Sequence, residues 1–288
     1  MPQRTFEPKV FKNISHQEKL ETDGYIHLKA VIDRQYTDAL LKVFEDAIAQ
    51  FRFYDNNPNF LNTIALENTD AKYYLKEHTT PILLKALAPI LDIEKINMPF
   101  GGAYCINPPQ AVMSCKPHQD PAYVDEEKTY SLIAWIPLED ITMENGCLHV
   151  LPKSHLWGNS KRSINMDWVF EEYSDELWKY LKPTPTQLGD IIIFDAALIH
   201  GTNVNTTSKN RLALNIPVLP KEAKMVTFSR INQYLICQHE VDSKYYLDEH
   251  IFQKPSKNYL SNISVFSAHA QIKRLRSALS KSVKYDGL

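Results

Sequence analysis

The sequence predicts an α+β chain in which a mostly helical first third precedes a mainly β middle third, folded as a sandwich or jelly roll. Residues 1–100 carry apolar side chains at helical spacing, whereas from residue 101 onward turn residues separate short apolar or alternating runs. With 288 residues and 44% hydrophobic content, the chain can bury one large core or two modest ones. Because it has no internal repeat and no long linker, we predict a single domain over residues 1–288, with residues 221–288 as a C-terminal extension.

Two helical regions are expected in the first third of the chain. In SHQEKLETDG, Ser15 and Glu18 have the spacing of a capping box, and YIHLKAVI after it is predicted to be a strand. Asp33 can then cap RQYTDALLKVFEDAIAQF, whose apolar stripe is expected to pack against a sheet: Tyr36, Leu40, Phe44, Ile48 and Phe51. A second helical region is predicted from about Asp70 to Leu91, and Pro81 is expected to restart it.

Five short runs are predicted to be the strands of a β-core over residues 101–220. They are GGAYCINPP, TYSLIAWIPL, CLHVLP, GDIIIFDAALIH and RLALNIPVLP. Asn145-Gly146 between two apolar runs predicts a hairpin turn, and Gly189-Asp190 marks another turn. In the extension, AQIKRLRSALSKSV is expected to form a docked helix with a solvated basic face. Contact of this helix with a membrane or an acidic partner is the alternative.

Composition argues against several classes of function. The net charge is −2, so no basic field indicates a nucleic-acid partner. No apolar run approaches the roughly 18 residues of a membrane span, and the charged start MPQRTFEPKVFKN lacks the apolar core of a signal peptide. The four cysteines have no C-x-x-C spacing, which favours reduced thiols and a cytoplasmic location. We therefore interpret the sequons at Asn13, Asn205 and Asn262 as chance. The oligomeric state is left open.

The segment KPHQD is a candidate for half of a metal site. On a strand, residues i and i+2 point to one face, so His118 and Asp120 would project together while Gln119 faces the other side. One imidazole and one carboxylate are two of the three ligands in a 2-His-1-carboxylate site. The alternative is a polar turn that happens to contain a histidine, so a third ligand is needed to decide.

His200 is the best candidate for that third ligand. It ends the apolar strand predicted at GDIIIFDAALIH, and a barrel can bring such distant strands side by side. Arg211 follows eleven residues later, and antiparallel pairing would bring it beside the strand of His200. Strand alternation places Arg211, Ala213 and Asn215 on one face, where a buried arginine would need an anion such as a bidentate carboxylate. An arginine at a turn edge, in solvent or in an ion pair, is the alternative.

This order of residues, H-x-D, a distant H and then R, resembles the phytanoyl-CoA dioxygenase family of Fe(II)- and 2-oxoglutarate-dependent oxygenases. The resemblance covers about residues 20–220 and includes the blocks DGYIHLKAVI, AYCINPP, LIAWIPLEDITMENGCLHVLPKSH and GDIIIFDAALIHGTNVNTTSKNRLALNI. It implies a double-stranded β-helix, which is the cupin-like form of the jelly roll, with N-terminal helices packed on the major sheet. The chain departs from the family at PKSH, where Lys153 replaces the usual glycine.

The resemblance implies a set of site residues and cofactors. His118, Asp120 and His200 would bind Fe(II), and Arg211 would pair with the distal carboxylate of 2-oxoglutarate, with O2 as the other cosubstrate. Three further residues match family positions near the cosubstrate or the metal: Thr202, Tyr104 and Trp135. For Tyr104 and Trp135, core packing is the alternative role.

The implied reaction is oxidation of a C–H bond of a small-molecule metabolite, with release of succinate and carbon dioxide. Asp120 favours hydroxylation, or a desaturation or cyclisation, because related iron halogenases lack this carboxylate. The near-neutral charge favours a small polar metabolite, such as an amino acid or related carboxylic acid, over an acyl-CoA. Residues 221–288 would then cover the mouth of the site. A zinc hydrolase, which would give Arg211 no role, and a non-catalytic metal-binding jelly-roll protein are alternatives of other classes.

Overall fold

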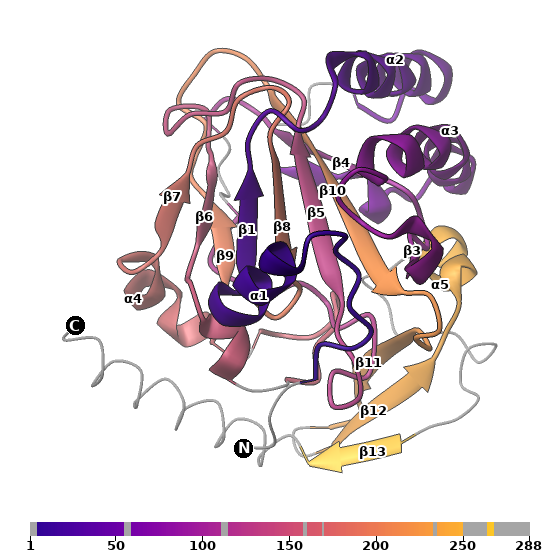
Figure 1. Ribbon diagram of the computed structural model, residues 1–288, viewed down its shortest axis with the longest axis vertical. Helices are drawn as coiled ribbons and strands as arrows, with labels where there is room; N and C mark the ends of the chain where they lie inside the picture. The colour runs from indigo at the N-terminus through magenta and orange to yellow at the C-terminus, as the bar shows by residue number, and fades with distance from the viewer. Residues whose placement is uncertain are drawn as a thin grey trace.

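The computed structural model describes residues 5–54, 59–110, 115–157, 160–168, 170–232 and 235–249, together with the backbone of residues 264–267. Two antiparallel sheets form its centre (Figure 1). The larger sheet has the strand order β1-β8-β5-β10-β4-β2, with β3 also paired to β10, and the smaller has the order β7-β6-β9. This arrangement confirms the prediction of a jelly-roll core preceded by helices.

The larger sheet consists of β1 (Tyr25–Leu28), β2 (Leu61–Asn62), β3 (Ile96–Asn97), β4 (Ala103–Asn107), β5 (Leu132–Pro137), β8 (Ile191–Asp195) and β10 (Arg211–Pro220). The smaller consists of β6 (Leu148–Val150), β7 (Lys182–Thr184) and β9 (His200–Thr202). The α-helices are α1 (Ile14–Asp23), α2 (Arg34–Phe51), α3 (Thr69–Leu87), α4 (Ser174–Trp178) and α5 (Ser243–Asp248). Short 3-10 helices span Thr63–Ala65, Ile93–Lys95, Ser154–Trp157 and Glu171–Tyr173.

Strand alternation gives the larger sheet two different apolar faces. On β10, Leu214 and Ile216 join the outer core that lies under the helices, whereas Ala213 joins the inner core between the sheets. The helices cover the outer face: α1 lies against β1 and β8, and α2 packs on α3 (Figure 1). The predicted stripe of α2 packs against the sheet in part: Leu40 is buried, and Phe44 stacks on Tyr104 of β4 with ring centroids 4.7 Å apart. The other residues that α2 buries are Thr37, Val43 and Ala47, which lie beside that stripe.

The predicted cap of α1 is wrong by two residues. The helix begins after Asn13, whose side chain accepts a hydrogen bond from the backbone N–H of Ser15 at 3.0 Å. Asparagine is among the strongest N-caps, so it replaces the Ser15–Glu18 capping box expected from spacing alone. Asp33 does occupy the N-cap position of α2, but its side chain makes no capping hydrogen bond there.

The prediction that Pro81 restarts a helix is also wrong. Pro81 lies inside α3, which runs through it without a break, and its ring is exposed. Proline removes one backbone donor and crowds the preceding turn. The helix continues because its buried side on both flanks, including Leu75 and Leu83, belongs to the outer core.

The turn at Asn145-Gly146 is present, but the predicted hairpin is not. Gly146 has a φ of +88°, which glycine adopts without strain. The turn connects β5 of the larger sheet to β6 of the smaller one, so the flanking strands do not pair with each other. The Asn-Gly pair therefore moves the chain from one sheet to the other.

The run GDIIIFDAALIH is not one strand ending at His200. Strand β8 ends at Asp195, a buried turn follows, and His200 opens β9 in the other sheet. The expected pairing of Arg211 with the strand of His200 is wrong for the same reason, because β10 pairs with β4 and β5 while β9 pairs with β6.

The described part of the C-terminal extension forms a separate small sheet and a helix. Strands β11 (Val226–Arg230), β12 (Leu235–Glu240) and β13 (Ser264–Ser267) pair in that order, and α5 packs beside α3 (Figure 1). The amphipathic helix predicted in AQIKRLRSALSKSV lies outside the described residues. None of the described helices has the length and apolar character that crossing a membrane requires.

Replacing Pro81 with alanine should stabilise the protein. The substitution restores a backbone N–H inside α3 and removes a steric clash, so we expect a gain of about 1–3 kcal/mol in the free energy of unfolding. Urea denaturation of the two proteins measures this difference. An unchanged or lower unfolding midpoint would contradict the inference that this proline destabilises the helix.

Candidate metal centre

His118 and His200 are brought together by backbone pairing. They form an isolated antiparallel bridge, in which the N–H of His118 donates to the carbonyl of His200 at 2.8 Å and the reverse bond measures 2.9 Å. The rings consequently lie with centroids 4.3 Å apart. The segment HQD is therefore not part of a regular strand, as alternation had suggested, but a loop joined to the first residue of β9.

The side chain of Asp120 completes a group of three potential ligands. Nε2 of His200 lies 3.6 Å from one carboxylate oxygen of Asp120, and Nε2 of His118 lies 4.0 Å from the other. The ligand atoms that His118, Asp120 and His200 offer all lie within 4.8 Å of one another. Such a spacing leaves room for one ion between them.

Both imidazoles are oriented by backbone carbonyls. Nδ1 of His118 lies 2.8 Å from the carbonyl of Lys116, and Nδ1 of His200 lies 3.0 Å from the carbonyl of Leu198. A carbonyl can only accept, so each Nδ1 carries a proton, and Nε2 is the nitrogen of each ring that is available to a metal. This arrangement of the second nitrogen is typical of metal-binding histidines.

The three groups compete for protons in a buried space. Burial raises the pKa of Asp120, and burial together with the charge of His118 lowers the pKa of His200 well below its usual value. Burial opposes the charge on His118 too, but Cys115 and Asp120 outweigh it and raise the pKa of His118 to about 10. One oxygen of Asp120 has no hydrogen-bond partner among the described residues. A divalent cation would satisfy the carboxylate and both imidazoles at once.

Arg211 is buried beside Trp135. It is 1% exposed, and none of its guanidinium nitrogens has a hydrogen-bond partner within the part of the chain that the structure describes. Its Cζ lies 5.9 Å from the ring centroid of Trp135. The hydroxyl of Thr202 is also buried and lacks a partner there. An unpaired buried polar group costs roughly 1–3 kcal/mol, so these groups indicate a site for an anion.

Cys115 connects this group to the three potential ligands. Its Sγ lies 3.7 Å from Nδ1 of His118, and its carbonyl accepts from the N–H of Thr202 at 2.9 Å. Its thiol is also among the groups that act electrostatically on Arg211. The structure thus brings together all but one of the residues predicted for the site.

Tyr104 is the exception. The structure favours core packing, the alternative role for this residue, over the predicted contact with a cosubstrate. Its hydroxyl donates to the carbonyl of Leu40 in α2 at 2.6 Å, and its ring belongs to the outer core under the helices. Tyr104 pairs in register with Leu214, so both point away from the interior. The alternation of β10 separates Leu214 from Arg211, but the register that pairs Leu214 with Tyr104 comes from the structure.

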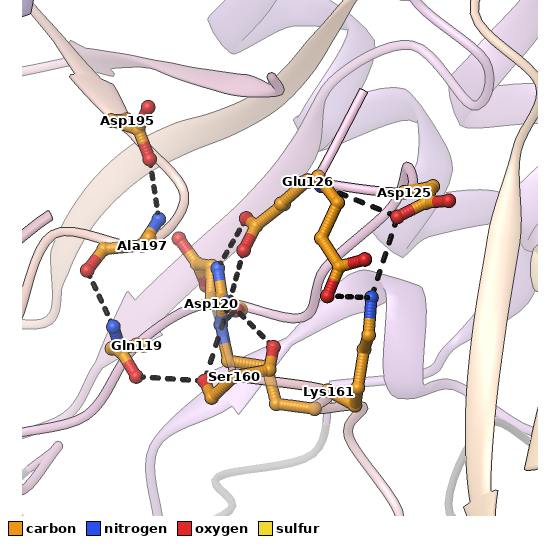
Figure 2. Close-up of polar contacts among 10 residues, drawn as sticks. Gln119, Asp120, Asp125, Glu126, Ser160, Lys161, Asp195 and Ala197 are labelled. Atoms are coloured by element: carbon orange, nitrogen blue, oxygen red, sulfur yellow. Dashed lines mark hydrogen bonds and ion pairs between the residues drawn. The ribbon is translucent and has the colours of Figure 1, made fainter. Parts of the chain in front are cut away.

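Sequence reasoning missed a polar network that supports the ligand loop. Figure 2 shows Gln119 between Ala197 and Ser160: its Nε2 donates to the carbonyl of Ala197 at 2.6 Å, and its Oε1 accepts from the hydroxyl of Ser160 at 3.2 Å. The N–H of Ala197 in turn donates to Asp195 at 2.7 Å. Gln119 therefore ties the loop of His118 to the turn that leads into His200.

A small cavity of about 40 Å³ adjoins Asp120 on the inner face of the larger sheet. Its polar side chains besides Asp120 are Asn62, Asn215 and Tyr123, and the rest of the lining is apolar: Ile64, Phe100, Ala103, Pro121, Ile164 and Pro217. Asn215 lies in register between Ala103 and Trp135 on the face that also carries Arg211. The cavity and the side chain of Arg211 therefore lie on the same, inner face of the larger sheet.

Comparison with known sequences identifies relatives of one kind. A model of the family "Phytanoyl-CoA dioxygenase (PhyH)" matches residues 20–213. Phytanoyl-CoA dioxygenase 1 of Oryza sativa subsp. japonica is 32% identical over 109 residues, which cover 37% of this chain and 39% of that protein. Phytanoyl-CoA dioxygenase of Arabidopsis thaliana is 33% identical over 109 residues, covering 37% and 38%. The matched segment thus spans well under half the length of either relative.

Solved structures share the fold at low sequence identity. The non-haem α-ketoglutarate-dependent carbocyclase SnoK of nogalamycin biosynthesis has a TM-score of 0.55 and 16% identity, over 74% of this chain and 86% of that one. The epimerase SnoN, solved with Fe3+, α-ketoglutarate and nogalamycin RO, has a TM-score of 0.50 and 17% identity, over 74% and 85%. At these identities the likeness concerns the fold.

A Tyr104→Phe variant should separate a packing role from a role in cosubstrate binding. Loss of the hydroxyl removes one buried hydrogen bond to Leu40, so we expect a loss of about 1 kcal/mol in stability and an unchanged affinity for 2-oxoglutarate. Thermal unfolding and equilibrium binding measure the two quantities. A large loss of 2-oxoglutarate affinity at unchanged stability would restore the contact inferred from the sequence.

Proposed function

The chain belongs to the phytanoyl-CoA dioxygenase (PhyH) family, and on this premise we propose that it is an Fe(II)- and 2-oxoglutarate-dependent dioxygenase of a small molecule. The observation that carries the proposal is the pairing of two unusual features in one interior. Two histidines and one carboxylate converge, and a buried arginine has no hydrogen-bond partner among the described residues. A zinc hydrolase would use the first feature and leave the second without a purpose.

The ligand set fits iron. Two imidazoles and one carboxylate are the donors of non-haem Fe(II) oxygenases, and a facial arrangement leaves further positions open to other ligands. His118 and His200 would bind through Nε2, because Nδ1 of each lies within hydrogen-bond distance of a backbone carbonyl. Asp120 would supply the charge that stabilises the divalent ion. When bound, iron with 2-oxoglutarate and O2 supplies the oxidising chemistry, and succinate and carbon dioxide are released.

Arg211 would hold the distal carboxylate of 2-oxoglutarate. Its planar fork matches a carboxylate with two parallel hydrogen bonds, and burial strengthens such a pair because water does not compete. Thr202 would add a hydroxyl donor to the same carboxylate. Trp135 would form the wall against which the guanidinium rests, since its ring lies beside Arg211.

The cavity next to Asp120 has a volume of only about 40 Å³, so the substrate would place just its reacting end there. We propose a small polar metabolite of the amino-acid or related carboxylic-acid class, oxidised at an unactivated C–H bond by hydroxylation, desaturation or cyclisation. The amides of Asn62 and Asn215 would bind its polar groups, and Phe100 and Ile64 would contact its carbon skeleton. The role of these residues is to orient one C–H bond towards the metal and to exclude water.

The described residues of the segments 221–232 and 235–249 would act with the core as one domain by closing the cavity. Tyr246 of α5 lies with its ring centroid 5.0 Å from that of Phe100 and 5.6 Å from that of Tyr123, and both of these rings line the cavity. Lys72 of α3 donates to the carbonyls of Tyr246 and Glu249, each at 3.2 Å. These contacts support a covering role for the described part of the extension.

Anaerobic titration with Fe(II) and 2-oxoglutarate tests the proposed function. We expect a weak visible charge-transfer band in the wild-type protein. In Arg211→Met, the 2-oxoglutarate concentration needed to form this band should rise about 100-fold, because the carboxylate loses a charged bidentate partner. Lys209→Met is the matched control, since Lys209 is exposed on the turn before β10. A folded wild-type protein that gives no band would refute the oxygenase assignment, and an unchanged requirement in Arg211→Met would remove Arg211 from the site.

Asn215→Leu tests the substrate site separately. With the compound that releases most succinate in a screen of small polar acids, we expect kcat/KM to fall about 10- to 100-fold, because a polar contact of the substrate is lost. The charge-transfer band should remain. Asn97→Leu, at an exposed asparagine of β3, is the control. Equal kcat/KM in Asn215→Leu and wild type would show that the substrate does not use this amide.

A further inference from the structure

A buried ion pair lies directly behind the ligand loop. Arg162 is 4% exposed and Glu126 is 3% exposed. The two side chains form a bidentate pair, in which Nη1 and Nη2 of Arg162 each donate to one carboxylate oxygen of Glu126 at 2.7 Å. Neither residue is a candidate ligand, and neither has a role in the chemistry described above.

The remaining donors of Arg162 hold the backbone of the carboxylate ligand. Its Nε donates to the carbonyl of Asp120 at 2.6 Å, and Nη1 also donates to the carbonyl of Ser160 at 3.0 Å. Asp120 lies outside the regular strands, two residues beyond the bridge that fixes His118. The guanidinium therefore supplies at Asp120 the kind of backbone restraint that pairing with His200 supplies at His118.

Stability alone does not explain this pair. Removing two charges from water costs so much that a buried ion pair often stabilises a protein less than apolar residues of the same volume. A buried pair of this geometry does impose one orientation on its surroundings. We propose that Arg162, held by Glu126, is a positioning residue that sets the Asp120 carboxylate for metal binding, an inference that rests on the metal site of the proposed function.

The negative charge of Glu126 is also needed for the proposed role of Arg162. An isolated guanidinium behind Asp120 would repel a divalent cation on the other side of the carboxylate, because the attraction or repulsion between charges is strong at low dielectric. Glu126 cancels that charge while leaving the donors of Arg162 in place. The ligand loop thus gains a rigid anchor without a net positive charge beside the metal.

The segment that carries Arg162 also borders the cavity and the C-terminal sheet. The carbonyl of Arg162 accepts from the N–H of Ala122 at 3.1 Å, and Ser163 donates to the carbonyl of Phe228 in β11 at 2.7 Å. Ile164 lines the cavity next to Asp120. The same anchor therefore places one metal ligand and one wall of the cavity relative to each other.

Lys161 offers a matched control. It is also buried, at 3% exposed, and its ammonium pairs with Asp125 at 3.3 Å and with Glu127 at 3.5 Å. Figure 2 shows this pair beside Glu126, on the side away from Gln119. Lys161→Met thus removes a neighbouring buried cation without touching the hydrogen bond to Asp120.

The test measures Co(II) binding and thermal unfolding in Arg162→Lys, Arg162→Met and the double variant Arg162→Met/Glu126→Met. Removing one partner leaves a lone buried charge, whereas removing both does not, so the double variant should recover part of the stability lost in Arg162→Met. The positioning of the Asp120 carboxylate should not recover in the double variant, because the hydrogen bond from Arg162 is still missing. We expect Co(II) affinity to fall about 10- to 100-fold in all three variants, with an altered visible absorption of the bound Co(II), and to stay unchanged in Lys161→Met.

A double variant that binds Co(II) with the affinity and spectrum of the wild type would overturn the proposal, as would full affinity in Arg162→Lys. An equal loss in Lys161→Met would overturn it too, because the effect would then be general to buried charge in this region. Co(II) binding needs neither 2-oxoglutarate nor turnover. The positioning role of Arg162 can therefore be refuted while the proposed oxygenase function stands. Conversely, an absent charge-transfer band in the wild type would refute the oxygenase function without bearing on the positioning role.

Discussion

Two backbone hydrogen bonds between His118 and His200 are the interaction on which the candidate site depends. They join a loop that follows β4 to the first residue of β9, two segments far apart in the sequence, and so set the two imidazoles side by side. Each ring is then turned by the carbonyl of a residue two positions earlier. Asp120 is held near both rings by the polar network around Gln119 and Arg162.

The interior of the jelly roll holds polar groups that the described part of the chain leaves unsatisfied. Buried polar groups in folded proteins are nearly always hydrogen-bonded, and exceptions require a cause. Here the unpaired atoms of the described residues include one oxygen of Asp120, the hydroxyl of Thr202 and the guanidinium of Arg211. A cation and a dicarboxylate would satisfy them with complementary charge. Without these ligands, the unpaired groups lower the stability of the folded chain.

The sequence predicted the order of layers and most of the site, and the failures have separable physical causes. Alternation along RLALNIPVLP placed Arg211 and Asn215 inside correctly, because a strand has a fixed period. The end of β8 was missed because the turn after Asp195 is as apolar as the strand itself, so that Asp195 alone marks the end of the strand. Tyr104 was assigned by family position, and its outward direction follows from a register that one strand cannot reveal. The Arg162–Glu126 pair was invisible because it joins two irregular segments.

The proposed site holds a metal and a dicarboxylate in one interior, at the residues named above. Anomalous diffraction from crystals grown without oxygen in Mn(II) and 2-oxoglutarate tests it directly. We expect one strong anomalous peak in contact with Nε2 of His118, Nε2 of His200 and the carboxylate of Asp120, with the distal carboxylate of 2-oxoglutarate on Arg211. A metal bound elsewhere, or a 2-oxoglutarate whose carboxylates both avoid Arg211, would contradict it.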